Sequence, residues 1–203
     1  MKRTLYSGIA VLALMLGGCS STSTAPAPKK EMKPAVAVGG QSGIFFMYQA
    51  ARQWNKDAQI LSVENINLDS VKPEGGKYGA WRATFVSLTA KTQKVFTYGV
   101  ADEGMVRKGT YAGSESIYAP KARARVIPIQ KVKVDTPAAL ETARKELKTV
   151  LEKNPDAPIQ FIMEWTNQMV NPVWRVVVGP SVSQSLGSVN VDADTGKLVK
   201  KAS

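Results

Sequence analysis

The chain of 203 residues contains no histidine and only one cysteine, Cys19. Without histidine, it lacks both the commonest general base of enzymes and the commonest metal ligand. A single cysteine cannot form an intramolecular disulfide, so packing alone must stabilise the fold. The chain also has neither a Ser-x-x-Lys arrangement nor a Gly-x-Ser-x-Gly motif that would activate a serine nucleophile. These absences predict a protein that is not an enzyme and that holds no cofactor and no metal.

The N-terminus has the layout of a secretory signal peptide. Lys2 and Arg3 precede an apolar run from Leu5 to Leu16. This run is shorter than the roughly 20 apolar residues that a membrane-spanning helix requires. We therefore expect the segment to be removed rather than to remain as a membrane anchor.

The four residues that end this run, 16–19, read Leu-Gly-Gly-Cys and resemble the lipobox of bacterial lipoproteins. The resemblance implies that residues 1–18 are a signal peptide and that Cys19 is the site of lipid attachment. Two or three acyl chains would hold the protein on a membrane almost irreversibly. Because Ser20 follows the cysteine in place of Asp, the resemblance implies the periplasmic face of the outer membrane. In a Gram-positive host, it implies the outer leaflet of the plasma membrane.

Basic residues exceed acidic ones. Removing Lys2 and Arg3 from the 27 basic residues leaves 25, against 16 acidic residues, and hence a formal charge of +9. Such a charge favours an envelope protein or an anionic envelope polymer as the partner, although a merely solvated surface is equally consistent with it. No nucleic-acid-binding motif is present, so we expect no nucleic acid partner.

Residues 19–43 are mostly Ser, Thr, Ala, Pro, Lys and Gly. This composition buries too little apolar surface to fold, and it predicts a lipidated tether about 25 to 30 Å long on average.

Two later segments repeat one order of elements, a helix followed by three strands. In the second, the apolar spacing predicts a helix that starts at Thr136 and ends at Asn154-Pro155, then strands at 159–165, 173–178 and 188–193. In the first, a helix near 44–54 precedes strands at 58–63, 81–86 and 94–100. The predicted fold class is α+β, with two similar units at 44–119 and 120–203. Each unit is expected to be a helix packed on a three- to four-stranded antiparallel sheet.

The end of the second unit resembles the PepSY family of secreted domains. The resemblance rests on the middle strand from Val173 to Val176 and on the closing pattern from Val189 to Val199, which contains Asp-Ala-Asp-Thr-Gly. It implies a small helix-on-sheet domain that binds or restrains partners, often peptidases, without catalysis. The first unit lacks the closing Asp-x-x-Thr-Gly. We interpret Asp192 to Gly196 as a turn rather than a calcium loop, because the later ligands of such a loop are missing.

Tryptophans on the predicted strands are candidates for the core. Trp81, Trp165 and Trp174 would each bury a large ring against the helices, with ligand stacking as the alternative. Successive strand residues face opposite sides, so Arg82 and Arg175 would lie on the open face of the sheet. There they are candidate partner-binding residues, or simply part of a polar exterior.

The most basic stretch opens the second predicted unit, before its helix. Its alternation from Arg123 to Val134 predicts a long strand, and Pro128 places that strand at a sheet edge. A charged partner would bind here, unless the lysines only protect the edge from aggregation. The candidate partner-binding residues of this stretch are Lys121, Arg123, Arg125, Lys131 and Lys133.

These observations together predict an envelope-anchored, non-catalytic binding or inhibitory lipoprotein that restrains a peptidase or another envelope protein. The alternative is a structural or assembly lipoprotein that contacts outer-membrane proteins or cell-wall polymer.

Overall fold

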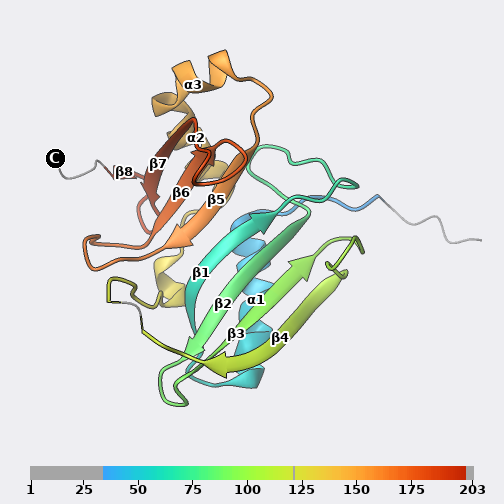
Figure 1. Cartoon of the computed structure of the whole chain (residues 1–203), viewed down its shortest axis with the longest axis vertical. Helices are drawn as coiled ribbons and strands as arrows, with labels where there is room; N and C mark the ends of the chain where they lie inside the picture. The colour runs from blue at the N-terminus through green and yellow to red at the C-terminus, as the bar shows by residue number, and fades with distance from the viewer. Residues whose placement is uncertain (1–33, 121, 200–203) are drawn as a thin grey trace, which may run out of the picture. The chain divides into compact units, whose positions relative to one another are not determined.

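The computed structural model describes residues 34–120 and 122–199 (Figure 1). The predicted signal peptide, Cys19 and the tether up to residue 33 lie outside the described residues, as does Lys121. The first described helix begins at Gly40, inside the range expected for the tether, and Val38 already pairs with Tyr78.

Helices and strands follow one another in two successive series. The first series is α1 (Gly40–Trp54), β1 (Gln59–Ile66), β2 (Ala80–Ser87), β3 (Thr92–Gly99) and β4 (Gly109–Ile117). A linker between β4 and α2, residues 118–135, contains a short 3-10 helix, η1 (Ile129–Lys131), and leads to the second series. That series is α2 (Thr136–Glu146), α3 (Lys148–Lys153), β5 (Ile159–Glu164), β6 (Val173–Val178), β7 (Gly187–Asp192) and β8 (Leu198–Val199).

The eight strands of the described residues form one antiparallel sheet in the order β4-β3-β2-β1-β5-β6-β7-β8. The prediction of two separate helix-on-sheet units is therefore wrong. The two meanders join because β1 pairs with β5, with Val63 opposite Met163 and Glu64 opposite Ile162. An unpaired strand edge leaves a row of N–H and C=O groups without partners, and pairing the two first strands removes two such edges.

Both long helices cover one face of the sheet (Figure 1). α1 packs on β2, β3 and β4, while α2 packs on β6 and β7. Within the described part of the chain, no helix is long and apolar enough to span a membrane.

The two long helices begin against each other. The side chain of Asp135 accepts a hydrogen bond from the backbone N–H of Thr136, so Asp135 caps α2 one residue before the predicted start. α1 has no side-chain cap of its own, and its first N–H groups are satisfied from the second series. Gly40 N–H donates to the Thr136 hydroxyl and Gln41 N–H to the Asp135 carboxylate, each over 2.9 Å. Since a helix start needs such partners, this contact places the start of α1 at Gly40.

The centre of the core is a pair of tryptophans. Trp81 and Trp174 are both 0% exposed, and their ring centroids lie 6.1 Å apart in an edge-to-face arrangement. Trp165 is 9% exposed. The prediction that these three rings pack in the core is confirmed. A single apolar cluster contains all three, so the two series share one core as well as one sheet.

Candidate partner-binding face

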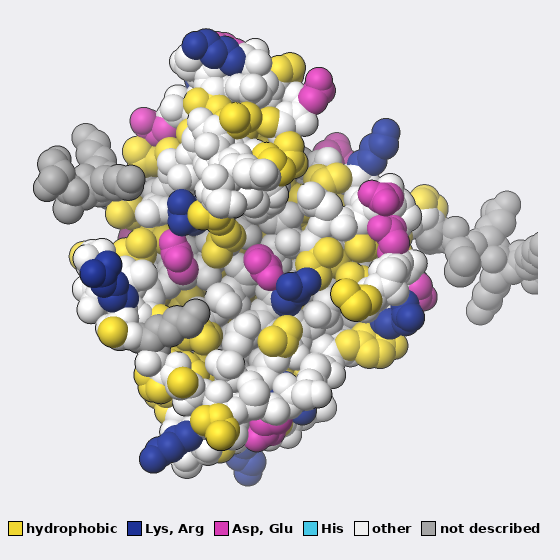
Figure 2. All heavy atoms as spheres, viewed as in Figure 1, with side chains coloured by type: hydrophobic (Ala, Val, Ile, Leu, Met, Phe, Trp, Pro, Cys, Tyr) yellow, Lys and Arg dark blue, Asp and Glu magenta, His cyan; other side chains and the backbone are white. Residues whose placement is uncertain are grey.

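The second face of the sheet carries no helix, and Figure 2 shows it directly, with acidic and basic side chains dispersed among apolar and polar ones. Arg82 and Arg175 lie on this open face, because each follows a buried tryptophan of the opposite face along its strand. This position was predicted from the sequence.

Strand pairing places the two arginines in one row across the sheet. The row runs from Arg82 through Glu64 and Ile162 to Arg175, and each residue is paired with the next. An Arg82 guanidinium nitrogen lies 3.2 Å from a Glu64 carboxylate oxygen, and both side chains are about half exposed. An ion pair at this exposure contributes little to stability, so both groups remain free to exchange partners.

Beside this row, β1 and β5 diverge, and the linker enters the gap between them. Ile127 exchanges two backbone hydrogen bonds with Ile60 of β1. Two residues earlier, Arg125 N–H donates to the carbonyl of Trp165, over 2.8 Å. Asn167 N–H also donates to the Arg123 carbonyl. The linker thus pairs with both series in turn, and the prediction of one long edge strand from Arg123 to Val134 is wrong.

A hollow of about 620 Å³ lies where the linker enters the sheet. This volume falls in the usual range of ligand pockets, about 300 to 1,000 Å³. Its charged lining residues are Arg123, from the linker, and Glu164, from the end of β5. The other lining residues are polar or apolar, namely Leu61, Ser62, Thr84, Gln93, Ile117, Tyr118, Ala119, Ala124, Trp165 and Thr166.

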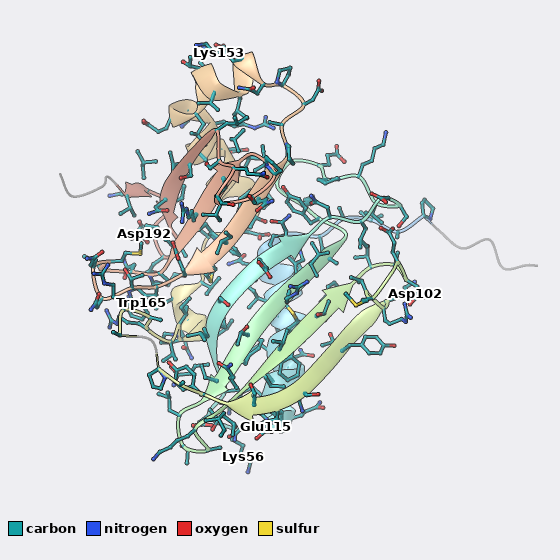
Figure 3. The ribbon with its side chains drawn as sticks, viewed as in Figure 1. Lys56, Asp102, Glu115, Lys153, Trp165 and Asp192 are labelled. Atoms are coloured by element: carbon teal, nitrogen blue, oxygen red, sulfur yellow. The ribbon has the colours of Figure 1, made fainter. Side chains whose placement is uncertain are left out.

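A second hollow of about 490 Å³ adjoins the first and shares three lining residues with it, Tyr118, Ala124 and Trp165. Arg125 lines it, with its guanidinium carbon 3.7 Å from the centroid of the Trp165 ring. Such a cation–π contact holds the guanidinium over the face of the ring. Trp165, labelled in Figure 3, therefore serves both the core and the wall of the two hollows.

The predicted basic residues divide into two groups. Arg123 and Arg125 line the hollows, whereas Lys131 and Lys133 lie against Asp194. Their ammonium nitrogens are 3.2 and 2.6 Å from its carboxylate oxygens. Lys133 and Lys131 together hold the pKa of Asp194 below its usual range. The single carboxylate of Asp194 offsets one of these two positive charges, so this end of the basic stretch is less positive than its two lysines alone would make it.

Residues Asp192 to Gly196 form a turn, as predicted. One carboxylate oxygen of Asp192 accepts the N–H groups of Asp194 and Thr195, each over 2.9 Å. Gly196 has a φ of +74°, a conformation that favours glycine. Burial raises the pKa of Asp192, but the hydrogen bonds from Asn171 and from this turn outweigh it and keep the pKa below its usual value. No cluster of acidic residues within 34–120 and 122–199 is arranged to hold a metal ion.

The hollows themselves were not predicted from the sequence. Their walls combine residues from β1, β2, the linker and the end of β5, which are far apart along the chain. Trp165 was predicted as a core residue with ligand stacking as the alternative, and Tyr118 and Glu164 were not singled out. The sequence around Arg125 gives no signal that its guanidinium will lie over the ring of Trp165, forty residues later.

A comparison of the chain with models of protein families, with curated proteins and with solved structures found no match.

Proposed function

We propose that the chain is an envelope lipoprotein, anchored through Cys19, that binds another envelope protein on the open face of its sheet without catalysing a reaction. The observation that carries this proposal is the hollow of about 620 Å³ beside the junction of β1 and β5, on a sheet face that no helix covers. The lipobox supplies the anchor. The resemblance of the second series to PepSY domains supports a role in binding or restraining a partner, such as a peptidase.

The charges of the open face favour a protein over an anionic polymer as the partner. Glu64 and Glu164 lie on this face together with Arg82, Arg123 and Arg175. A polymer of one charge sign would meet repulsion from the two carboxylates, whereas a protein surface offers groups of both signs and apolar side chains as well. The two lysines that would extend a positive surface are already paired with Asp194.

A charge reversal with a matched control tests the binding face. Arg123→Glu reverses one charge at the hollow. Lys153→Glu reverses one charge on α3, which lies at the top of the view, away from Trp165 (Figure 3). Exposed charges contribute little to stability, so both variants should fold.

The readout is capture of partners from envelope extracts with the wild type and both variants. We expect the wild type and Lys153→Glu to retain the same envelope protein and Arg123→Glu to lose most of it. Equal capture by all three proteins would contradict the assignment of the binding face.

The anchor is tested separately by Cys19→Ser, because the thioether to lipid requires the thiol. We expect the wild type to incorporate labelled fatty acid in the producing cells, and the variant to incorporate none and to accumulate as an uncleaved precursor. Labelled fatty acid in the variant would overturn the lipoprotein assignment.

A further inference from the structure

The outward side of α1 carries two exposed phenylalanines. Ile44, Met47 and Ala51 bury the inner side of the helix, whereas Phe45 is 55% exposed and Phe46 is 41% exposed. Their ring centroids lie 5.8 Å apart. Neighbouring large apolar side chains on a surface mark a site that meets an apolar phase or another molecule.

Each phenylalanine ring packs against a neighbouring aromatic ring. Phe46 stacks on Tyr98 of β3, with ring centroids 4.7 Å apart and an interplanar angle of 14°. Burial raises the pKa of the Tyr98 hydroxyl. The three rings form an aromatic cluster on the helix-covered side of the molecule. Phenylalanine is among the residues that membrane-surface helices insert into the lipid interface.

The charge of α1 suits a phosphate-bearing surface. The helix contains no acidic residue, and its outer side adds Ser42, Gln49, Arg52 and Gln53 to the phenylalanines. Acidic groups lie at both ends of the helix. Asp135 accepts the Gln41 N–H at its start, and past its end Glu115 accepts a hydrogen bond from the Trp54 indole and Asp57 accepts one from the Thr89 N–H. Two lysines lie near the end of the helix. Lys56 follows it in the chain, and Lys94 lies over the ring of Trp54. Among the described residues, the exposed side chains of α1 itself include none that would repel an anionic headgroup.

The position of α1 in the chain brings it close to the proposed anchor. The described chain starts at Pro34, six residues before α1, and fourteen residues, 20–33, lie between Cys19 and Pro34. The fifteen steps of chain from Cys19 to Pro34 span at most about 50 Å even when fully extended. A surface held this close to the bilayer has a high effective concentration toward it, so even a weak contact is populated.

We propose that the outer side of α1 docks on the bilayer that carries the lipid anchor, with Phe45 and Phe46 inserted among the headgroups. This inference rests on the proposed lipidation of Cys19. Because α1 covers one face of the sheet, docking turns the open face and its hollows away from the membrane, toward a partner in the aqueous space.

The test uses the full lipidated protein, in which Cys19 is blocked as a thioether and an introduced cysteine is the only free thiol. Gln49→Cys lies one turn after the two phenylalanines, and the matched control Ser188→Cys is an exposed position on the open face. Each variant is labelled with a polarity-sensitive fluorophore. It is then reconstituted on vesicles of three parts phosphatidylethanolamine to one part phosphatidylglycerol.

We expect the label at residue 49 to shift to shorter wavelength and gain several-fold in intensity on vesicles, while the label at residue 188 stays in water. Phe45→Ser, and Phe45→Ser with Phe46→Ser, should return the label at residue 49 to its aqueous emission while the protein stays vesicle-bound through its anchor. Circular dichroism confirms that these variants are folded.

Three outcomes would overturn the inference. A protein that floats with vesicles but keeps an aqueous label at residue 49 excludes docking and leaves the anchor intact. A protein without lipid by mass spectrometry overturns the anchor and the docking together. A label at residue 49 that becomes buried without vesicles, with a dependence on protein concentration, shows that a second copy covers this surface instead.

Discussion

At the scale of residues, Trp81 and Trp174 make equivalent hydrogen bonds in the two series. Each indole N–H donates to a carbonyl two residues before a long helix, Trp81 to Val38 over 3.0 Å and Trp174 to Val134 over 2.8 Å. Each ring therefore ties its strand to the start of a helix. Gly43 permits this packing, since a Cβ at that position would lie 2.6 Å from the Trp81 ring.

Replacement of either ring should be severe. Trp81→Ala and Trp174→Ala should each lower the free energy of unfolding by about 3 to 5 kcal/mol, because each leaves a large cavity in the shared core. Urea denaturation measures the loss. Val170→Ala is the control, since Val170 is 89% exposed and should change stability little. Losses below about 1 kcal/mol for both tryptophans would show that the rings are not buried.

A second residue-scale prediction concerns pH. The Ser87 hydroxyl and the Thr89 N–H, which donates to the carboxylate over 2.9 Å, lower the pKa of Asp57 to about 2. A group with a depressed pKa stabilises the fold above its unfolded pKa of about 3.9, and that stabilisation is lost as the pH falls through the folded pKa.

The wild type should therefore be more stable than Asp57→Asn above about pH 4, and the difference should shrink between about pH 4 and about pH 2. Urea denaturation of both proteins across this range measures the difference. A difference that does not change with pH would show that the carboxylate is not held in its charged form.

At the scale of elements, the junction of β1 and β5 is short and is completed by side chains. Only two residue pairs of these strands are in register. Beyond them, the Asn65 side-chain oxygen accepts the Phe161 N–H over 2.7 Å, and the Tyr78 hydroxyl donates to the Ile159 carbonyl. These bonds satisfy backbone groups of β5 where β1 no longer does.

Asn65→Ala should destabilise the protein by about 1 to 3 kcal/mol, because it leaves the partly buried Phe161 N–H without an acceptor. Asn65→Asp keeps an acceptor oxygen at the same place and should lose less. Urea denaturation and amide hydrogen exchange at Phe161 report the two effects. Equal losses for both variants, with unchanged exchange at Phe161, would show that the hydrogen bond does not hold the junction.

The local elements were largely predictable because their signals are local. Apolar spacing indicated both long helices and six strands, and alternation assigned Trp81 and Arg82 to opposite faces. The linker was not predictable in this way. Its residues do alternate, but Arg125 pairs with Trp165, just past the end of β5, whereas Ile127 pairs with Ile60 of β1. The same alternation therefore corresponds to two different partners. The start of α1 was also not predicted, because the groups that cap it, Asp135 and Thr136, lie far from it along the chain.

At the scale of the whole molecule, the sequence could not show that the two meanders share a sheet. Two separate sheets and one continuous sheet require the same buried faces, and they differ only in whether β1 meets β5. For the same reason Arg82, Arg123 and Arg175 were predicted as single candidates, while the hollow beside the β1–β5 junction was not. A hollow built from both series exists only once the strands are joined.

Joining the two meanders into one sheet gives the molecule one helix-covered face and one open face. The binding proposal depends on a partner that lies on the open face, beside the junction of β1 and β5. The most direct measurement is photo-crosslinking in the producing cells, with a photoreactive amino acid at Thr84, which lines the hollow, or at Glu152 on α3 as the control. We expect one discrete adduct with an envelope protein from position 84, and none from position 152. The same adduct from position 152 alone, or no adduct from position 84, would contradict the assignment of the open face as the binding face.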